Sequence, residues 1–498
     1  MQSGNYYKII EIPKFSLRNT LKKYKKKLLL GFDPQLFTSS LIKRNFDDIF
    51  NLLPIEENFI DKIYKEKNKN FVNSFYSLNI KVTGESINSK INRLISKIKS
   101  NNIENIFISS PENVAWLLNL RGRDNPNSPI PNCKIILTDK KKIYFFSCPK
   151  KINQIKKNKQ YKNLIFCTYK DFSKVIYKLK GKNFCIDNLT CSISNESIIS
   201  KSFRIKLKTD PCYMMKSIKN KIEIKHTKDA HFKDGLALTK FIFWIKNINQ
   251  KKITEIEAKN KLEKFRRLDK DYLFPSFDTI AGTGSNGAII HYRVNKKSNK
   301  VIKKNDIFLC DSGGQYNYGT TDVTRTICFS EQKKSIKDAF TNVLKGHIAV
   351  AQTNLNKINT GKKIDASARK FLNRDGLDYA HGTGHGVGFF LNVHEGPQSI
   401  SKYNSVKIKE GMILSNEPGY YKKGYYGIRI ENLVYVKKNK KNLQFENLTL
   451  APIEAKLINY KLLSKSEKDY LFKYHLTIYS MYYKFLNMKE RKWLASLI

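Results

Sequence analysis

The stretch IFLCDSGGQYNYGTTDVTRT, residues 307–326, decides the fold because its pattern sets two aspartates on one predicted hairpin. Asp311 ends an apolar run typical of a strand, and the glycine pair that follows predicts a turn. Residues 320–327 then alternate like a returning strand. A hairpin of this size can bring Asp311 and Asp322 face to face, although they lie eleven residues apart. The sequence therefore predicts two carboxylates at one place in the fold.

Three more candidate metal ligands lie downstream in short motifs: His385 in HGTGHGVG, Glu417 in SNEPGYY and Glu431 in GIRIEN. Taken singly, such acidic residues are more typical of turns, caps or the solvated surface. Taken together, four carboxylates and one imidazole are too many ligands for one zinc ion. They suit two divalent ions about 3.5–4 Å apart, and a water bound to such ions becomes hydroxide readily because its pKa falls to about 7.

The donor types also narrow the choice of metal. An oxygen-rich set with one nitrogen favours Mn²⁺, Fe²⁺, Co²⁺ or Zn²⁺ over metals that prefer thiolates. We expect two divalent metal ions, with Mn²⁺ as the first choice and Co²⁺, Fe²⁺ or Zn²⁺ as alternatives.

These motifs resemble those of the creatinase and aminopeptidase family with the pita-bread fold, and within it the long cytosolic type of Xaa-Pro aminopeptidase. The matching segments are SFDTIAGTGSNGAIIHY (276–292), LCDSGGQYNYGTTDVTRT (309–326), HGTGHGVGFFLNVHEGP (381–397) and SNEPGYYKKGYYGIRIEN (415–432). The family's five metal ligands fall, without substitution, on Asp311, Asp322, His385, Glu417 and Glu431. The resemblance implies an α+β fold class, with a pita-bread catalytic domain preceded by an α/β domain like the creatinase N-terminal one.

The same resemblance assigns further catalytic residues by position. His291 matches the histidine that lines the proline pocket, and His381 and His394 match the pair that moves protons and holds the scissile carbonyl. Arg429 matches an arginine that orients the cluster, and Glu417 doubles as the acid or base for the nucleophile's proton. An isolated histidine is more often a structural residue, but the placement around a metal set favours function.

The implied activity is removal of one N-terminal residue from peptides with proline in the second position, by a hydroxide that bridges the two metals. Two alternatives stay open. One is a prolidase, which splits Xaa-Pro dipeptides; the tail APIEAKLINYKLLSKSEKDYLFKYH (451–475) and the AIIHY motif argue against it. The other is a pita-bread domain used only for binding, which the complete set of ligands disfavours. The resemblance also implies a homodimer.

The expected domain organisation has four parts. Residues 1–25 form a basic stub, 26–205 the α/β domain, 212–448 the catalytic domain and 449–498 a C-terminal helical extension. The segment ENVAWLLNLRGRDNP (112–126) and the tail carry the resemblance to the long type. The long type resembles a three-domain chain, and only about 25 residues precede the strand that ends at Asp33-Pro34. We therefore expect that its first domain is absent or reduced to a stub.

Composition excludes some classes of protein and leaves others open. The 92 Lys and Arg against 43 Asp and Glu give a net charge of +49, but the lysines are spread along the whole chain. This favours a composition bias over a nucleic-acid or membrane surface. No CxxC pair occurs among the eight cysteines, which we expect to be reduced and mostly buried. Without a signal-like start or an apolar run of membrane length, the expected location is the cytoplasm.

Local patterns predict the main elements. Residues 83–98 and 113–119 predict helices, 134–137 with 143–146 a hairpin, and 218–246 with 254–267 two longer helices. After Asp271 short strands are expected to dominate up to Val436, before helices return.

A glycine motif could be mistaken for a cofactor site. Gly282, Gly284 and Gly287 spell GxGxxG, but β-type sequence follows where a dinucleotide site needs a helix. We therefore interpret these glycines as a close-packed loop beside His291.

Overall fold

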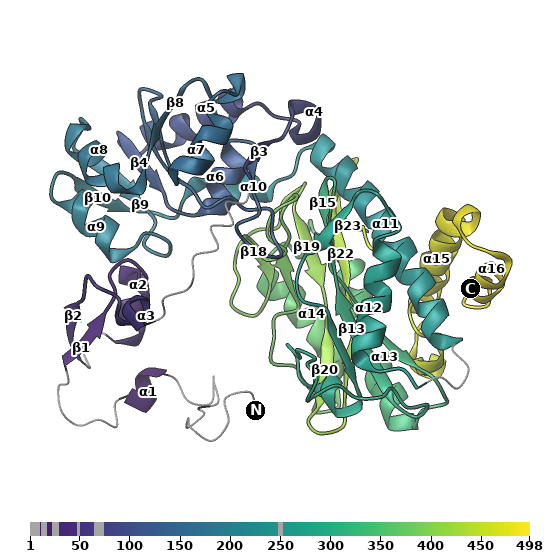
Figure 1. The fold of residues 1–498 in the computed structure, drawn as a ribbon. Helices are drawn as coiled ribbons and strands as arrows, with labels where there is room; N and C mark the ends of the chain where they lie inside the picture. The colour runs from purple at the N-terminus through teal and green to yellow at the C-terminus, as the bar shows by residue number, and fades with distance from the viewer. Residues whose placement is uncertain (1–9, 11–16, 22–28, 47–49, 64–73, 248–251) are drawn as a thin grey trace. The chain divides into compact units, whose positions relative to one another are not determined.

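The computed structural model describes residues 10, 17–21, 29–46, 50–63, 74–247 and 252–498 (Figure 1). Most of the basic stub expected over 1–25 lies outside these residues. The chain divides into two compact units, one made of 1–76, 87–120 and 131–212, the other of 77–86, 121–130 and 213–498.

The first unit is built on a six-stranded mixed sheet. Its strands run in the order β10 (Arg204–Leu207), β9 (Asn183–Ile186), β4 (Asn105–Ile108), β6 (Lys134–Thr138), β7 (Ile143–Phe146) and β8 (Leu164–Cys167). β6 and β7 form the expected hairpin. The amphipathic helix expected over 83–98 is α5 (Ile87–Lys99), whose apolar stripe is buried, and 113–119 corresponds to α6 (Pro111–Leu117). β1 (Leu29–Phe32), which ends before Asp33-Pro34, pairs in parallel with β2 (Asn51–Pro54) in a sheet of their own.

The second unit contains the strands that carry the candidate ligands. One sheet has the order β12 (Ile280–Thr283), β13 (Ile307–Ser312) and β16 (Val323–Cys328), and another the order β18 (Glu395–Ile400), β17 (Gly384–Gly386), β19 (Ile413–Asn416), β22 (Asn432–Asn439) and β23 (Asn442–Asn447). Short pairings join β11 (Tyr272–Pro275), β14 (Gly314–Tyr316) and β15 (Gly319–Thr320), and join β20 (Gly419–Lys422) to β21 (Tyr426–Arg429). This mixture of helices and largely antiparallel sheets is the α+β class expected.

Six longer helices cover these sheets: α11 (Lys221–Lys246), α12 (Glu255–Arg266), α13 (Lys334–Ala351), α14 (Gly361–Arg374), α15 (Lys465–Tyr482) and α16 (Met488–Ala495). α11 packs along α12, and α13 along α14 (Figure 1). α11 begins at a capping box, in which the Asn220 side chain accepts from the N–H groups of Ile222 and Glu223. The predicted helices over 218–246 and 254–267 are thus confirmed to within a few residues.

The expectation that short strands dominate between Asp271 and Val436 was wrong in one respect, because α13 and α14 interrupt them. α13 buries Ala339, Val343 and Val350 on one face, at the spacing of an amphipathic helix. The returning strand expected over 320–327 is confirmed as β16, which pairs antiparallel with β13. All six of its residues are buried, because the strand is covered on both faces: Val323 and Ile327 lie in the core, and Thr324 bonds to Glu431 on the other side.

The glycine motif does not introduce a dinucleotide-binding helix. β12 leads into a 3₁₀ turn, Gly284–Ala288, and no α-helix follows before residue 294. The β-type continuation expected over AIIHYRV is also absent, since these residues form turns and irregular backbone. Close packing within the motif explains its glycines, because a Cβ on Gly282 would lie 2.8 Å from the Gly287 backbone nitrogen.

The cysteine prediction is confirmed, since all eight are free thiols and six are buried.

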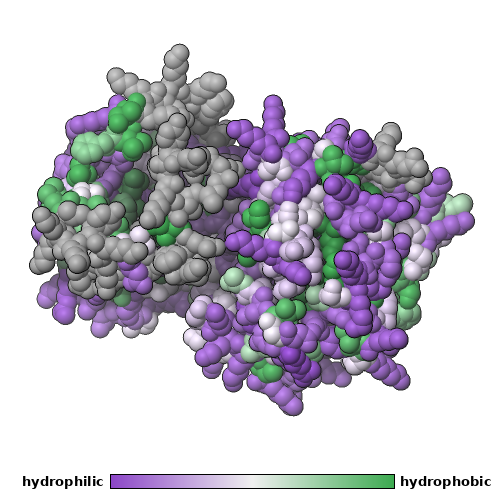
Figure 2. Space-filling model, turned by 90° about the horizontal axis from the view of Figure 1, so that it is seen from below, coloured by the Kyte–Doolittle hydropathy of each residue, from purple (hydrophilic) through white to green (hydrophobic). Residues whose placement is uncertain are grey.

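Within the described part of the chain, no helix has both the length and the apolar character needed to cross a membrane. Hydrophilic residues are spread over the face shown in Figure 2, with only small hydrophobic patches between them.

Candidate metal centre

The five predicted ligands come from separate strands of the second unit that meet at one place. Asp311 lies in β13, Asp322 directly before β16, His385 in β17, Glu417 directly after β19, and Glu431 between β21 and β22. The register of β13 and β16 pairs Asp311 with Thr324, two residues beyond Asp322. The hairpin predicted from the sequence therefore does bring the two aspartates to one end of a strand pair.

His385 faces the carboxylates with one defined ring nitrogen. Its Nε2 lies 3.4 Å from Asp322 Oδ2 and 3.4 Å from Glu417 Oε1. Its Nδ1 lies 2.9 Å from the Gly386 carbonyl oxygen and donates to it, so Nε2 keeps its lone pair for a ligand. Ligand atoms of Asp322, His385 and Glu431 all lie within 4.8 Å of one another. This spacing suits three donors around one cation.

Backbone packing fixes His385 in this position. A Cβ on Gly384 would lie 2.0 Å from the carbonyl oxygen of Ser415, so only glycine allows β17 to approach β19 this closely. The N–H of His385 then donates to Ser415 Oγ at 2.9 Å. Gly384 of the HGTGHGVG motif thus serves the close approach of β17 to β19 beside the candidate ligand.

Asp311 occupies the other side of the cluster. Its Oδ2 accepts a 2.6 Å hydrogen bond from the Arg429 guanidinium. Its Oδ1 is buried and has no hydrogen-bond partner in the described part of the chain. A buried carboxylate oxygen without a donor is costly unless a cation binds it. This oxygen without a partner is evidence, independent of the family resemblance, that the donor set fits metal ions.

The electrostatics of the cluster point the same way. Burial, together with the neighbouring carboxylates, raises the pKa of Asp322 and of Glu431 well above the ordinary range. Burial also raises the pKa of Asp311, although Arg429 opposes the shift. Burial would raise the pKa of Glu417 too, but the histidines His385 and His381 outweigh it and the pKa is lowered. Four carboxylates this close need positive charge among them to remain ionised.

Hydroxyl groups hold two of the carboxylates in place. Thr324 Oγ1 donates to Glu431 Oε2 at 2.8 Å, and Ser415 Oγ donates to Glu417 Oε1 at 2.9 Å. The Arg429 Nε in turn donates to Thr324 Oγ1 at 3.1 Å. Sequence reasoning missed Thr324 and Ser415, although each lies two residues before or after a predicted ligand on a strand. Period-two spacing was the available signal, because alternate strand residues share a face.

A second missed group lies behind Glu431. The Arg325 guanidinium is buried and donates to the Glu431 carbonyl oxygen at 2.6 Å and to the Thr324 carbonyl oxygen at 2.8 Å. The same side chain lies 3.0 Å from the hydroxyl of Tyr474, a residue of α15 in the C-terminal extension. The backbone that carries Glu431 is thereby connected to the extension. No signal in the sequence joined residues so far apart.

The predicted catalytic histidines line a cavity of about 480 Å³ with the five ligands and Arg429. The His394 ring packs edge-on against His385, with ring centroids 4.2 Å apart. His291 is exposed on the cavity wall, where Phe277, Ile280 and Ile290 supply apolar surface. The structure therefore brings every predicted site residue to one cavity.

Tyr421 connects His381 to Arg429 and was also missed. Arg429 donates to the Tyr421 hydroxyl at 2.5 Å, and this hydroxyl lies 2.9 Å from His381 Nε2. His381 Nδ1 lies 2.7 Å from the Gly382 carbonyl oxygen and donates to it. The tyrosine proton therefore points to His381 Nε2, and burial lowers the pKa of His381, although the Glu417 carboxylate opposes the shift.

Known proteins share this architecture. The chain matches Metallopeptidase family M24 over residues 225–438, the Creatinase/Prolidase N-terminal domain over 66–223 and the C-terminal region of peptidase M24 over 441–497. It is 37% identical to a probable Xaa-Pro aminopeptidase P of Laccaria bicolor, over 90% of this chain and 73% of that protein. It is 36% identical to Xaa-Pro aminopeptidase 1 of Dictyostelium discoideum, over 89% and 74%.

Solved structures of related enzymes share the fold of this chain. A cytosolic X-prolyl aminopeptidase with a di-nuclear active site from Caenorhabditis elegans superposes with a TM-score of 0.89 at 29% identity, covering 98% of this chain and 83% of that one. The prolidase of Pyrococcus furiosus superposes with a TM-score of 0.57 at 25% identity, over 72% and 99%. The chain belongs to the M24 metallopeptidases, with the pita-bread fold expected. Within them it belongs to the Xaa-Pro aminopeptidases. The chain is less similar to the prolidase than to the X-prolyl aminopeptidase, in TM-score and in sequence identity.

Proposed function

We propose that this chain is a dinuclear-metal Xaa-Pro aminopeptidase that releases the first residue of peptides with proline in the second position. One observation carries the proposal. Four carboxylates and one imidazole converge on a cavity whose buried Asp311 oxygen has no hydrogen-bond partner within the described residues. The likeness to the X-prolyl aminopeptidase of C. elegans, described as having a di-nuclear active site, supports the same activity.

We assign the metal ligands to Asp311, Asp322, His385, Glu417 and Glu431, which would hold two divalent ions, Mn²⁺ first among the candidates. When bound, such ions polarise the scissile carbonyl and lower the pKa of water to about 7. The chain's own hydroxyl groups and guanidinium keep the ligand oxygens oriented. This support is typical of metal sites, where the groups behind the ligands fix their direction.

The remaining residues handle the substrate. His394, beside His385 on the cavity wall, is placed to donate to the scissile carbonyl oxygen as negative charge develops there. Glu417, whose pKa is lowered, is ionised at neutral pH and accepts the proton of the attacking water. His381 can exchange a proton with Tyr421 at 2.9 Å and so deliver one toward the proline nitrogen. The proline ring would rest against the apolar wall beside His291.

Several further assignments belong to the same proposal. We assign residues 26–205 to a creatinase N-terminal-like domain, 212–448 to the catalytic domain and 449–498 to the helical extension, which agrees broadly with the family matches. We also assign a homodimer and a cytoplasmic location. The cytosolic description of the C. elegans enzyme supports the location.

The test compares matched peptides. The purified protein, loaded with Mn²⁺, should release only arginine from a peptide that begins Arg-Pro-Pro, and should leave the matched Arg-Ala-Pro peptide almost untouched. The variant Asp322→Asn should lose this activity, because it removes a ligand charge while keeping the size of the side chain. Equal cleavage of both peptides would overturn the proline specificity, and full activity of Asp322→Asn would overturn the metal site.

A further inference from the structure

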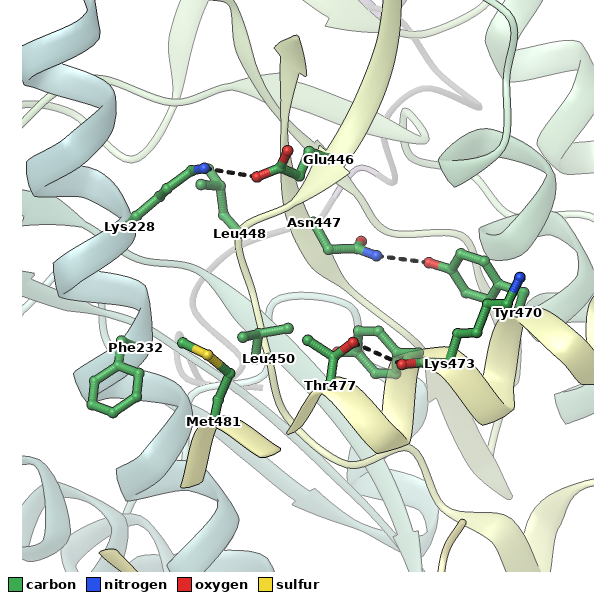
Figure 3. Close-up of a pocket in the computed structure, with 11 residues that line it drawn as sticks. Lys228, Phe232, Glu446, Asn447, Leu448, Leu450, Tyr470, Lys473, Thr477 and Met481 are labelled. Carbon is green, nitrogen blue, oxygen red and sulfur yellow. Dashed lines mark hydrogen bonds and ion pairs between the residues drawn. The ribbon is translucent and has the colours of Figure 1, made fainter. Parts of the chain in front are cut away.

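A second cavity lies apart from the metal centre, against the C-terminal extension. It measures about 460 Å³ and opens between α11, the chain that leaves β23, and α15 (Figure 3). This volume lies within the 300–1,000 Å³ typical of sites for small molecules. None of its lining residues lines the metal cavity; one of them, Tyr474, is connected to the metal centre through Arg325.

One part of this cavity is apolar. Phe232 comes from α11, Leu448 and Leu450 from the segment after β23, and Met481 from the end of α15. Figure 3 shows Phe232, Leu450 and Met481 together on one side of the cavity, away from the polar groups. Met481 remains 44% exposed, so this apolar wall is open to solvent. An exposed apolar surface inside a cavity favours a ligand with an apolar body.

The other part presents hydrogen-bond donors whose protons lack acceptors. The Tyr470 hydroxyl accepts from Asn447 Nδ2 at 2.9 Å, and its own proton has no acceptor in the described part of the chain. The Lys473 ammonium, one turn further along α15, forms no ion pair with any described carboxylate. Thr477, by contrast, already donates its proton to the Lys473 carbonyl oxygen at 2.8 Å. Two donors one helical turn apart on α15 therefore line the cavity, the Lys473 side chain exposed and Tyr470 half-buried.

The charges around the cavity favour an anion. Its lining contains one carboxylate, Glu446, and both oxygens of this group are bound, one by Lys228 and the other by Lys437, each at 2.7 Å. Glu446 is therefore neutralised and repels an anion only weakly. Lys473 adds a further positive charge, so the local balance is positive. A carboxylate can accept from both the Lys473 ammonium and the Tyr470 hydroxyl and also offsets the positive charge, whereas a neutral acceptor leaves that charge uncompensated.

We propose that this cavity binds an amphipathic monocarboxylate, with an alkyl or aryl body on Phe232, Leu450 and Met481 and the carboxylate between Tyr470 and Lys473. The two oxygens of a carboxylate accept one hydrogen bond from each of these donors. The site is separate from the peptidase cavity, and its occupant need not be a substrate.

Calorimetric titration of the full-length protein tests the assignment, with decanoate as the probe. We expect saturable binding at one site, with clearly weaker binding of decanol, which lacks the charge, and of acetate, which lacks the body. Lys473→Gln should weaken decanoate binding about threefold to tenfold, and Tyr470→Phe about threefold, because each removes one partly exposed donor. The matched control is Lys468→Gln, which removes an exposed α15 lysine outside the cavity and should leave the affinity unchanged.

Three results would overturn the proposal. Decanoate could fail to saturate at millimolar concentration, or decanol could bind as tightly, which would leave only apolar contact. Lys468→Gln could weaken binding as much as Lys473→Gln, which would mean diffuse attraction by a chain of net charge +49. The cleavage rate of an Xaa-Pro peptide in each variant serves as the folding control, since none of these residues touches the metal cavity.

Discussion

The connection from Tyr474 through Arg325 to Glu431 predicts that the C-terminal extension supports the metal centre. Arg325 is 1% exposed and donates to six acceptors at 2.6–3.0 Å, among them the carbonyl oxygens of Glu431 and Pro452 and the hydroxyl of Tyr474. No carboxylate side chain is among these acceptors. The guanidinium is thus held by neutral groups that converge on it from β16, β22 and the start of the extension.

The perturbation is Arg325→Lys, which keeps the charge but has only three donors on one nitrogen. At least three of the six hydrogen bonds are lost. Some acceptors keep another donor, as the Thr324 carbonyl oxygen does with the N–H of Glu431 at 3.2 Å. We therefore expect the free energy of unfolding to fall by about 2–4 kcal/mol. Because the Glu431 backbone loses its support, Mn²⁺ affinity should fall about 10-fold to 100-fold.

The assay must separate support of the metal site from a general loss of stability. Ile478→Ala provides the matched control, since Ile478 is fully buried in the same helix as Tyr474 and its truncation costs about 2–5 kcal/mol. Both variants are titrated with Mn²⁺ at a temperature where both are folded. We expect weakened affinity in Arg325→Lys, a smaller loss in Tyr474→Phe and none in Ile478→Ala. Equal affinities in Arg325→Lys and Ile478→Ala would refute the reasoning.

Three other predictions follow from the site and the core. A chelator should abolish peptide cleavage and lower the melting temperature, and added Mn²⁺ should restore both; full activity after verified metal removal would contradict the assignment of the centre. His394→Ala should lower turnover by about 10²–10³, the scale for one oxyanion donor, with the metal content measured by mass spectrometry unchanged. Burial lowers the pKa of His347 to about 3, against about 6.5 unfolded, so the unfolding free energy should fall as pH drops below about 6.5, by up to about 1.4 kcal/mol per pH unit. In His347→Gln, the slope of unfolding free energy against pH, measured by denaturant titration, should be smaller by the contribution of one proton. An unchanged slope would contradict the assignment to His347.

The sequence was informative where function forces unusual residues onto regular strands. The two aspartates of 307–326 could be placed on a hairpin because a turn signal separates a run of apolar residues from an alternating one. Patterns that depend on solvent were less reliable. β16 is buried on both faces, so its burial does not alternate, and α13 was missed among the Gly- and Thr-rich segments around it. Period arguments need one solvated face, and the central strands of this unit have none.

Residues that support the ligands divide into two groups by the same reasoning. Thr324 and Ser415 lie two residues from a ligand, so strand periodicity contains their position. Tyr474 lies 149 residues from Arg325, and only the packing of α15 onto the second unit brings the two together. Tyr421 is similar, because nothing in GYYKKGYYGIR distinguishes it from the other tyrosines. Contacts of this kind are set by tertiary packing, which one sequence does not reveal.

The supports also explain how four carboxylates can be assembled before any cation binds. Burial and mutual repulsion raise the pKa of Asp322 and Glu431, so the empty cluster can lower its charge by holding protons. Meanwhile Thr324, Ser415 and Arg429 fix the carboxylate directions with hydrogen bonds that do not involve a metal. Binding then replaces protons with cations at oxygens that are already in place. The ligand side chains are therefore ordered during folding and not on metal binding, so their ordering entropy does not reduce the metal affinity.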